Sequence, residues 1–175
     1  MEHSHACCSA FPVGRRSLLL GAAAGLIAFR PYLLRAASGN YQAMLLSCID
    51  PRMQEPVRDY LAKRGLTGKY SQFTFAGAAI GAVAPKFADW HKTFWDNLAA
   101  SIELHNIKSV IAIDHRDCGA AKMAYGDKKV ATPDLETETH RAALTEFRKE
   151  SMKRHPNLAV ETMLMALDGS VVSLG

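Results

Sequence analysis

Two short apolar runs in this sequence each end directly in a group of polar and reactive side chains. The first run covers residues 43–48 and ends in a cysteine, with an aspartate and an arginine directly after it, whereas the second covers residues 110–113 and leads into a histidine and another cysteine. Runs of this length suit strands that are buried on both faces, as in a parallel sheet. Ligands of open parallel sheets bind beyond the carboxyl ends of the strands. We therefore expect both polar groups to face one crevice.

The segments around these two runs alternate between helical and strand patterns. We predict helices over 55–64, 93–105, 118–125 and 139–154, and further strands over 70–75, 159–167 and 170–174. The last helix is polar, so we expect a solvated charged face, and the last two strands are joined by a tight turn at Asp168-Gly169. This order predicts an α/β fold with a mainly parallel sheet, flanked by helices and finished by an antiparallel C-terminal edge strand.

The N-terminal part of the chain has the layout of an export signal. An arginine pair at residues 15–16 precedes about a dozen apolar residues, and small residues follow at 36–38. The arginine pair with the following Ser-Leu resembles a twin-arginine signal. The apolar run is shorter than the roughly 20 residues that span a bilayer, so we expect no stable membrane span. We predict a cleaved leader over 1–38, a single catalytic domain over 39–175, and a periplasmic or exported protein; an uncleaved tether and a structural helix are the alternatives.

Charge and cysteine usage change once this leader is set apart. The whole chain has 21 basic and 17 acidic residues and a net charge of +4, which would suit a nucleic-acid partner. Four basic residues and one acidic residue precede the predicted cut, which leaves 17 against 16, and we expect no nucleic-acid partner. The leader also holds His3, His5, Cys7 and Cys8, which we do not expect to bind metal, because nothing there would orient the ligands.

The two remaining cysteines and one histidine form a candidate metal site. Cys48 follows the first apolar run, while His115 and Cys118 follow the second, three positions apart. Two thiolates and an imidazole suit Zn²⁺, and a set of three protein ligands leaves the fourth position open, as in catalytic sites. Zinc there lowers the pKa of bound water to about 7 and so supplies a hydroxide nucleophile. A Cys48–Cys118 disulfide and a pair of inert buried thiols are the competing interpretations.

Asp50 and Arg52 lie two residues apart, directly after Cys48. A guanidinium that holds a carboxylate keeps it ionised and oriented. Held in this way, Asp50 can accept a hydrogen bond from the metal-bound hydroxide, or bind the metal itself when water is absent. The roles of Asp114 and Asp117 stay open between orienting His115 and capping the next helix.

Together these motifs resemble the paired signature of the β-class carbonic anhydrases. The signature is Cys-x-Asp-x-Arg over 48–52 followed by His-x-x-Cys-Gly over 115–119, and the segments 99–110 and 167–171 are also similar to that family. The resemblance covers nearly all of the chain after the leader. Two positions depart from the pattern: Asp114 stands where the family usually has glycine, and the segment 74–79 keeps Ala-Gly but loses the family's polar members.

The resemblance implies one Zn²⁺ per chain, bound by Cys48, His115 and Cys118, with Asp50 and Arg52 as the catalytic residues. It implies reversible hydration of CO₂ to bicarbonate and a proton, and a homodimer or homotetramer. Relatives on this scaffold hydrolyse CS₂ or COS, which is the alternative activity. A non-catalytic zinc-binding or disulfide-stapled protein is the alternative from another class. We expect His91 and His105 to be ordinary surface or core histidines rather than proton shuttles.

Overall fold

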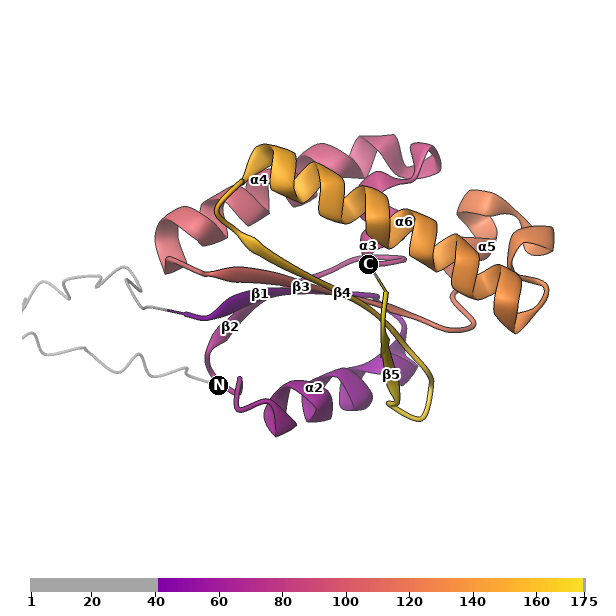
Figure 1. Ribbon diagram of the computed structural model, residues 1–175, viewed down its shortest axis with the longest axis horizontal. Helices are drawn as coiled ribbons and strands as arrows, with labels where there is room; N and C mark the ends of the chain where they lie inside the picture. Colours follow the sequence, from indigo (N-terminus) through magenta and orange to yellow (C-terminus); the bar gives the residue numbers. More distant parts are fainter. Residues whose placement is uncertain (1–40, 175) are drawn as a thin grey trace, which may run out of the picture. The chain divides into compact units, whose positions relative to one another are not determined.

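Five strands form one sheet in the order β2-β1-β3-β4-β5 (Figure 1). The computed structural model describes residues 41–174, and the predicted leader over 1–38 lies outside the described residues. The first three neighbouring pairs of strands in the sheet are parallel, and only β4 and β5 run antiparallel. The strands are β1 Ala43–Ser47, β2 Tyr70–Thr74, β3 Ser109–His115, β4 Ala159–Met165 and β5 Val171–Ser173. The predicted fold class is therefore confirmed.

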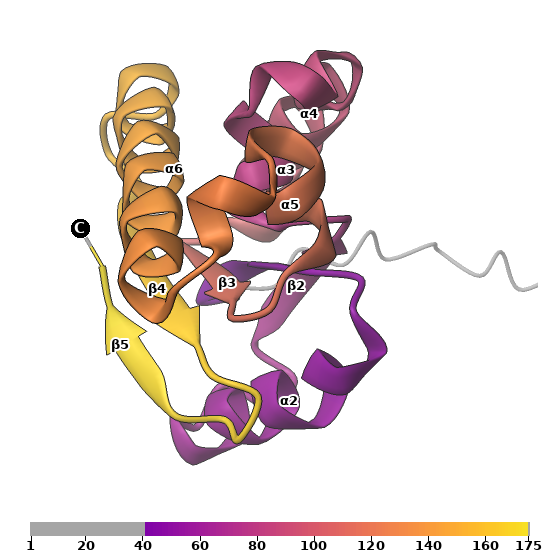
Figure 2. The same cartoon turned by 90° about the vertical axis from the view of Figure 1, so that its right-hand side faces the viewer.

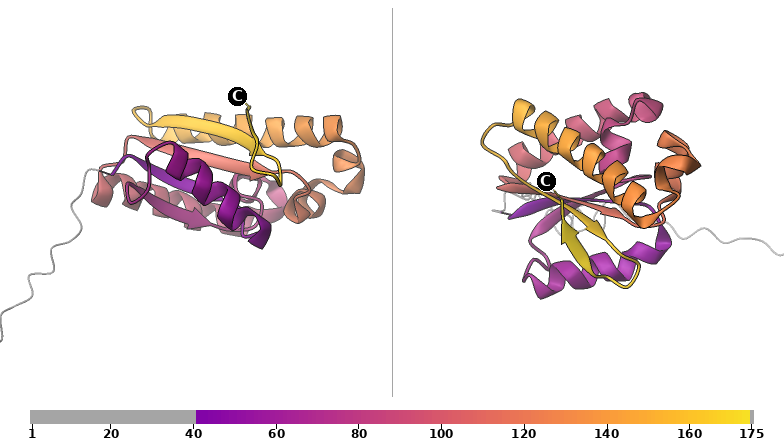
Figure 3. Two further views of the ribbon diagram at one scale, coloured as in Figure 1. Left: turned by 90° about the horizontal axis from the view of Figure 1, so that it is seen from below. Right: turned by 45° about the vertical axis from the view of Figure 1, so that its right-hand side comes forward.

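Helices cover both faces of this sheet. Among the described residues, α3, α4, α5 and α6 lie on one face of the sheet and α2 lies on the other, as Figures 2 and 3 show from further directions. The helices are α2 Gln54–Lys63, α3 Ala79–Val83, α4 Ala88–His105, α5 Gly119–Tyr125 and α6 Pro133–Arg154, with short 3₁₀ turns η1 Pro51–Met53, η2 Pro85–Phe87 and η3 Asp127–Val130. None of the described helices combines the length and apolar character needed to cross a bilayer.

The central strand β3 supplies side chains to two separate apolar cores. Successive residues of a strand point to opposite faces. Val110 and Ala112 accordingly pack with Phe94, Leu98 and other side chains under α4 and α6. The intervening Ile111 and Ile113 pack on the opposite face, in the core that includes Val57 and Leu61 of α2. This burial on both faces explains why the run is apolar without alternation.

Three helix predictions differ from the structure. Helix α4 begins at Ala88 instead of residue 93, directly after the 3₁₀ turn η2. Helix α6 begins at Pro133 instead of residue 139, because Thr132 caps it and its hydroxyl accepts a hydrogen bond from the Leu135 N–H. Helix α3 was not predicted, since a stretch of small residues carries no clear helical period.

The charged face predicted for α6 is only partly in contact with water. His140 and Ser151 are entirely buried, and Glu136 is largely buried. Arg148 also donates to the Val160 carbonyl oxygen, at 2.6 Å. Several polar groups of this helix therefore point into the domain, where they need partners.

Candidate metal centre

Three potential metal ligands converge where β1 and β3 end. Cys48 follows β1, His115 is the last residue of β3, and Cys118 directly precedes α5. The parallel register places Ser47 opposite Ile113, so Cys48 lies beside the end of β3. The sulfur atoms of the two cysteines and a ring nitrogen of His115 all lie within 4.8 Å of one another. The structure thus brings together the predicted ligand set, although its members come from distant parts of the sequence.

The histidine is prepared to bind a metal through one nitrogen. His115 is 1% exposed, and its Nδ1 lies 2.8 Å from the Arg116 carbonyl oxygen, so Nδ1 carries the proton and donates. Nε2 is buried and has no hydrogen-bond partner. A buried lone pair beside two thiols is the arrangement that a Zn²⁺ ion with sulfur and nitrogen ligands would satisfy. The donor set therefore fits zinc.

The two thiols are electrostatically unequal. Cys48 interacts with Cys118, and this interaction lowers the pKa of Cys48 to about 4, with further help from His115 and from the Gly77 N–H, which donates to Cys48 Sγ at 3.3 Å. The same interaction, together with burial, raises the pKa of Cys118. Burial opposes a charge on His115, but the neighbouring Cys48 raises its pKa overall. Both cysteines are free thiols. One thiolate is thus already favoured at neutral pH, and thiolates are the form that binds metal.

Asp50 and Arg52 form a close ion pair next to these ligands. Arg52 Nη2 donates to Asp50 Oδ2 at 2.6 Å and its Nε donates to Oδ1 at 3.0 Å, while the Arg52 backbone N–H also donates to Oδ1. These bonds lower the pKa of Asp50 to about 2. Asp50 Oδ2 lies 3.9 Å from His115 Nε2. The carboxylate is therefore ionised and close to the candidate ligand His115.

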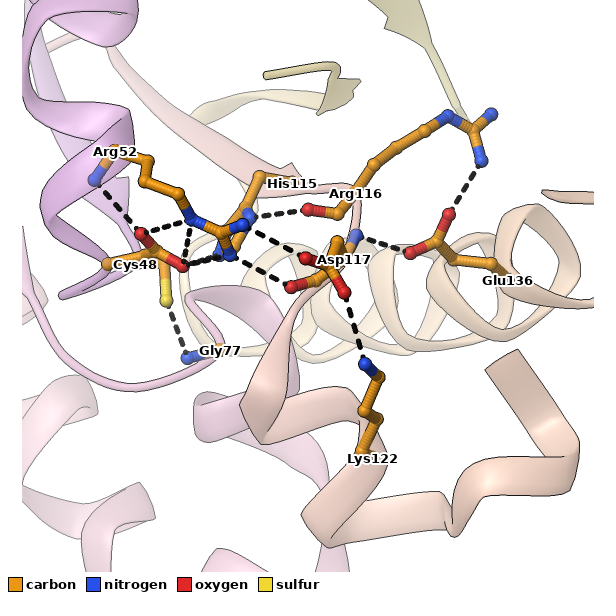
Figure 4. Close-up of polar contacts among 9 residues, drawn as sticks. Cys48, Arg52, Gly77, His115, Arg116, Asp117, Lys122 and Glu136 are labelled. Atoms are coloured by element: carbon orange, nitrogen blue, oxygen red, sulfur yellow. Dashed lines mark hydrogen bonds and ion pairs between the residues drawn. The ribbon is translucent and has the colours of Figure 1, made fainter. Parts of the chain in front are cut away.

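Sequence reasoning missed the second partner of Arg52. Arg52 Nη1 donates to Asp117 Oδ2 at 2.9 Å, and Nη2 donates to the Asp117 carbonyl oxygen at 3.1 Å. Lys122 and Glu136 contact Asp117 from other sides (Figure 4). The contacts lower the pKa of Asp117, Arg52 first and Lys122 next. Arg52 and Asp117 are 65 positions apart, so no local sequence pattern predicts their contact. The one signal in the sequence is that Asp117 lies between the candidate ligands His115 and Cys118.

Asp114 also contacts a residue that the sequence did not single out. Its Oδ2 lies 2.8 Å from His140 Nδ1, and its Oδ1 accepts the Ala79 N–H at 2.9 Å. Neither Asp114 nor Asp117 accepts the proton of His115 Nδ1, which the Arg116 carbonyl oxygen takes instead. The hypothesis that one of them orients His115 through this atom is therefore wrong.

His91 and His105, the two histidines weighed as proton shuttles, contact other parts of the fold. His91 Nε2 lies 3.0 Å from the Ala84 carbonyl oxygen, and His105 packs edge-on against Tyr41. Both have structural contacts, as the sequence suggested.

An apolar hollow of about 370 Å³ opens beside the loop that holds Cys48. Ile49, the residue after Cys48, and Ala76, the residue before Gly77, both line it. The other lining residues are Phe73, Thr74, Phe75, Trp90 and Thr93. A small apolar molecule could therefore collect beside the loop that holds Cys48.

Comparison with known families agrees with this arrangement. The family described as "Putative carbonic anhydrase" matches residues 38–148, more than half of the chain, and this range contains all three candidate ligands. The chain belongs to this carbonic anhydrase family. An uncharacterized protein of Rickettsia bellii is 35% identical over 128 residues, which are 73% of this chain and 78% of that relative.

Solved β-carbonic anhydrases share the fold of this carbonic anhydrase family member. The Coccomyxa β-carbonic anhydrase in complex with acetazolamide has a TM-score of 0.54 at 14% identity, covering 91% of this chain and 82% of that chain. The β-carbonic anhydrase CafA of Aspergillus fumigatus has a TM-score of 0.51 at 15% identity, covering 91% of this chain and 88% of that chain. The resemblance drawn from the sequence motifs is therefore confirmed at the level of family and fold.

Proposed function

We propose that this protein catalyses the reversible hydration of CO₂ to bicarbonate and a proton at a zinc ion held by Cys48, His115 and Cys118. The observation that carries the proposal is the set of three donor atoms within 4.8 Å, one of them a buried imidazole nitrogen without a hydrogen-bond partner. Membership of the carbonic anhydrase family supports the same conclusion. When bound, Zn²⁺ supplies Lewis acidity, which lowers the pKa of a coordinated water to about 7.

Two of the three candidate ligands have contacts that hold them for this task. The Arg116 carbonyl oxygen fixes the ring orientation and the tautomer of His115. The Gly77 N–H donates to Cys48 Sγ, which reduces the negative charge that this sulfur places on the metal.

Asp50 and Arg52 act on the reacting molecules rather than on the fold. Because the pKa of Asp50 is about 2, its carboxylate stays ionised and can only accept hydrogen bonds at neutral pH. An ionised Asp50 carboxylate binds a nucleophile that still carries a proton to donate. The hydrogen bond between them orients the nucleophile so that its lone pair faces the substrate. Arg52 holds that carboxylate in place by donating from both Nε and Nη2.

The apolar hollow beside Ile49 suits the uncharged substrate. CO₂ has no hydrogen-bond donor and prefers an apolar wall to bulk water. Bicarbonate carries a charge and is not stabilised there, so the product is expected to leave toward the solvent. We therefore expect the hollow beside the Cys48 loop to hold CO₂ in preference to bicarbonate.

The test combines metal analysis with stopped-flow CO₂ hydration on the purified protein. We expect one zinc per chain and measurable turnover, loss of both in Cys48→Ser, and loss of turnover with retained zinc in Asp50→Asn. Purified protein that holds no stoichiometric zinc would falsify the proposal, and unchanged turnover in both variants would remove the roles assigned here. Sulfide release from CS₂ or COS in place of CO₂ hydration would assign the alternative activity.

We further propose that the mature protein is an exported homodimer or homotetramer. The twin-arginine pattern at residues 15–16 supports export, and the resemblance to β-carbonic anhydrases supports oligomers. N-terminal sequencing of periplasmic protein tests the first point, and an uncut N-terminus would contradict the cleaved leader. Light scattering coupled to gel filtration tests the second, and a monomeric mass would contradict it.

A further inference from the structure

The Arg52 guanidinium is held by two carboxylates, and the second belongs to the turn that carries two of the candidate ligands. Besides its bonds to Asp50, Arg52 donates through Nη1 to Asp117 Oδ2 at 2.9 Å and through Nη2 to the Asp117 carbonyl oxygen at 3.1 Å. We propose that Asp117 is a positioning residue that orients Arg52 and, through it, the Asp50 carboxylate at the metal position. The inference rests on the proposed function, because it assigns a part in the same reaction.

Asp117 is itself fixed from several directions. Its backbone φ is 54°, in the left-handed region that aspartate tolerates better than most residues. Its N–H donates to Glu136 Oε1 at 2.6 Å, and its Oδ1 accepts from Lys122 Nζ at 3.0 Å (Figure 4). Contacts from α5 and α6 therefore hold both the backbone and the side chain of Asp117. The Asp117 carboxylate therefore sets where the Arg52 guanidinium lies, through the hydrogen bond from Nη1.

Without Asp117 the pair of Arg52 and Asp50 would be held mainly by the loop that carries both. The two residues are only two positions apart, and the side chain of Arg52 is 46% exposed. With only this loop to hold them, both side chains would move more, and the hydrogen bond from Arg52 Nε to Asp50 Oδ1 would open more often. The contact with Asp117 joins residues 65 positions apart and so ties the loop after β1 to the turn after β3.

A purely stabilising role explains this contact poorly. The side chains of Arg52 and Asp117 are 46% and 55% exposed, and ion pairs this exposed contribute little to the stability of a fold. The contact can matter more for the orientation of Asp50, because Asp50 Oδ2 lies only 3.9 Å from the candidate ligand atom His115 Nε2. A misplacement of about 1 Å in a catalytic group can cost on the order of a hundredfold in rate.

Two substitutions in the zinc-loaded protein separate charge from backbone effects. Asp117→Asn removes the charge and tolerates the positive φ, and Asp117→Gly removes the side chain at a φ that suits glycine. The control is Glu161→Gln, which breaks a similar exposed pair, Arg64 Nη1 to Glu161 Oε2 at 2.8 Å, without touching the candidate site.

The first readout is the ¹⁵N NMR signal of the Arg52 side chain, assigned by its loss in Arg52→Lys. We expect a sharp, slowly exchanging Nε–H in the wild type and in Glu161→Gln. In Asp117→Gly we expect fast exchange or a broadened signal, with an intermediate signal in Asp117→Asn, while zinc stoichiometry stays at the wild-type value. An unchanged Arg52 signal in both Asp117 variants would overturn the inference, and so would loss of zinc, which would show that Asp117 acts on the ligand turn itself.

The second readout is a double-mutant cycle on CO₂ hydration. We expect Asp117→Gly to lower kcat/KM about tenfold or more, and to add no further loss in an Asp50→Asn background, because its effect passes through Asp50. An equal loss in both backgrounds would overturn the inference. If the wild type hydrates no CO₂, or Asp50→Asn retains no measurable rate, the NMR signal alone decides, so failure of the proposed function is distinguishable from failure of this one.

Discussion

His140 Nδ1 lies 2.8 Å from Asp114 Oδ2, and neither side chain has any exposed surface. Asp114 immediately precedes the candidate ligand His115, and its second oxygen accepts the N–H of Ala79 at the start of α3. Burial raises the pKa of Asp114, and the hydrogen bond from His140 opposes that rise. The pair thus links α3 and α6 to the residue beside the candidate metal centre, inside the protein.

Replacing His140 by leucine should destabilise the fold strongly. The substitution leaves Asp114 buried without its side-chain partner, and breaking a buried pair in this way costs about 3–5 kcal/mol. Urea denaturation followed by circular dichroism measures the free energy of unfolding. Glu138→Gln, an exposed substitution on the same helix, is the control and should stay within about 0.5 kcal/mol of the wild type. A loss below about 1 kcal/mol in His140→Leu, less than a single typical hydrogen bond contributes, would contradict this account.

In the zinc-free protein Cys48 should react with iodoacetamide at a rate that hardly changes with pH. With a pKa of about 4, the thiol is already ionised throughout neutral pH. An ordinary thiol with a pKa near 8.5 would lose about tenfold in rate for each unit of pH below that value. Mass spectrometry of the peptide that contains Cys48 gives the rate between about pH 5.5 and about pH 8.

Cys118 serves as the internal control for this measurement. Its pKa is raised and it is 2% exposed, so it should react far more slowly than Cys48. Loading with zinc should protect both thiols. A steep rise of the Cys48 rate with pH would show that its thiolate is not stabilised as described.

The ionisation of Asp50 should depend on Arg52. The pKa of Asp50 is lowered to about 2 in the folded protein, below the value of about 3.9 for an unfolded chain. The pair therefore contributes stability above pH 4 or so, and this contribution is lost as the pH falls through about 2. Carbon-13 NMR of the carboxyl group should show a higher pKa for Asp50 in Arg52→Met than in the wild type. An unchanged low pKa in that variant would assign the shift to another group.

Gly81→Ala should destabilise the loop that supports Cys48. Gly81 is buried, and an added Cβ would overlap the Ala76 carbonyl oxygen and press on the Phe75 ring. Overpacking of this kind costs about 1–3 kcal/mol. Gly119→Ala is the matched control, since a Cβ there meets nothing within 4 Å. Thermal unfolding of the two variants side by side measures the difference, and equal melting temperatures would show that the loop yields without cost.

The sequence was most informative where chemistry follows a strand. Cys48, His115 and Cys118 could be predicted to meet because β1 and β3 are short apolar runs, and parallel strands end at the same edge of a sheet. Asp50 and Arg52 could be paired because they are close in the chain. These inferences need only local patterns and one general rule about sheets.

The parts that escaped prediction depend on contacts between distant segments. His140 lies in a helix whose polar residues read as solvated, yet it is entirely buried against Asp114. Asp117 adopts a positive φ, which the sequence does not predict because this position is not a glycine. Its partners come from the loop after β1, from α5 and from α6. The early start of α6 was recognisable in principle, since Thr132 followed by Pro133 is a typical beginning of a helix.

The pairing of Ser47 with Ile113 has a consequence for metal binding. If β1 slipped by one residue along β3, Cys48 would move by about 3.3 Å and its side chain would change faces of the sheet. Metal–ligand distances tolerate only about 0.2 Å, so a slipped chain could not assemble the three donors. Binding of the ion at the proposed site would then require the register in which Ser47 pairs with Ile113.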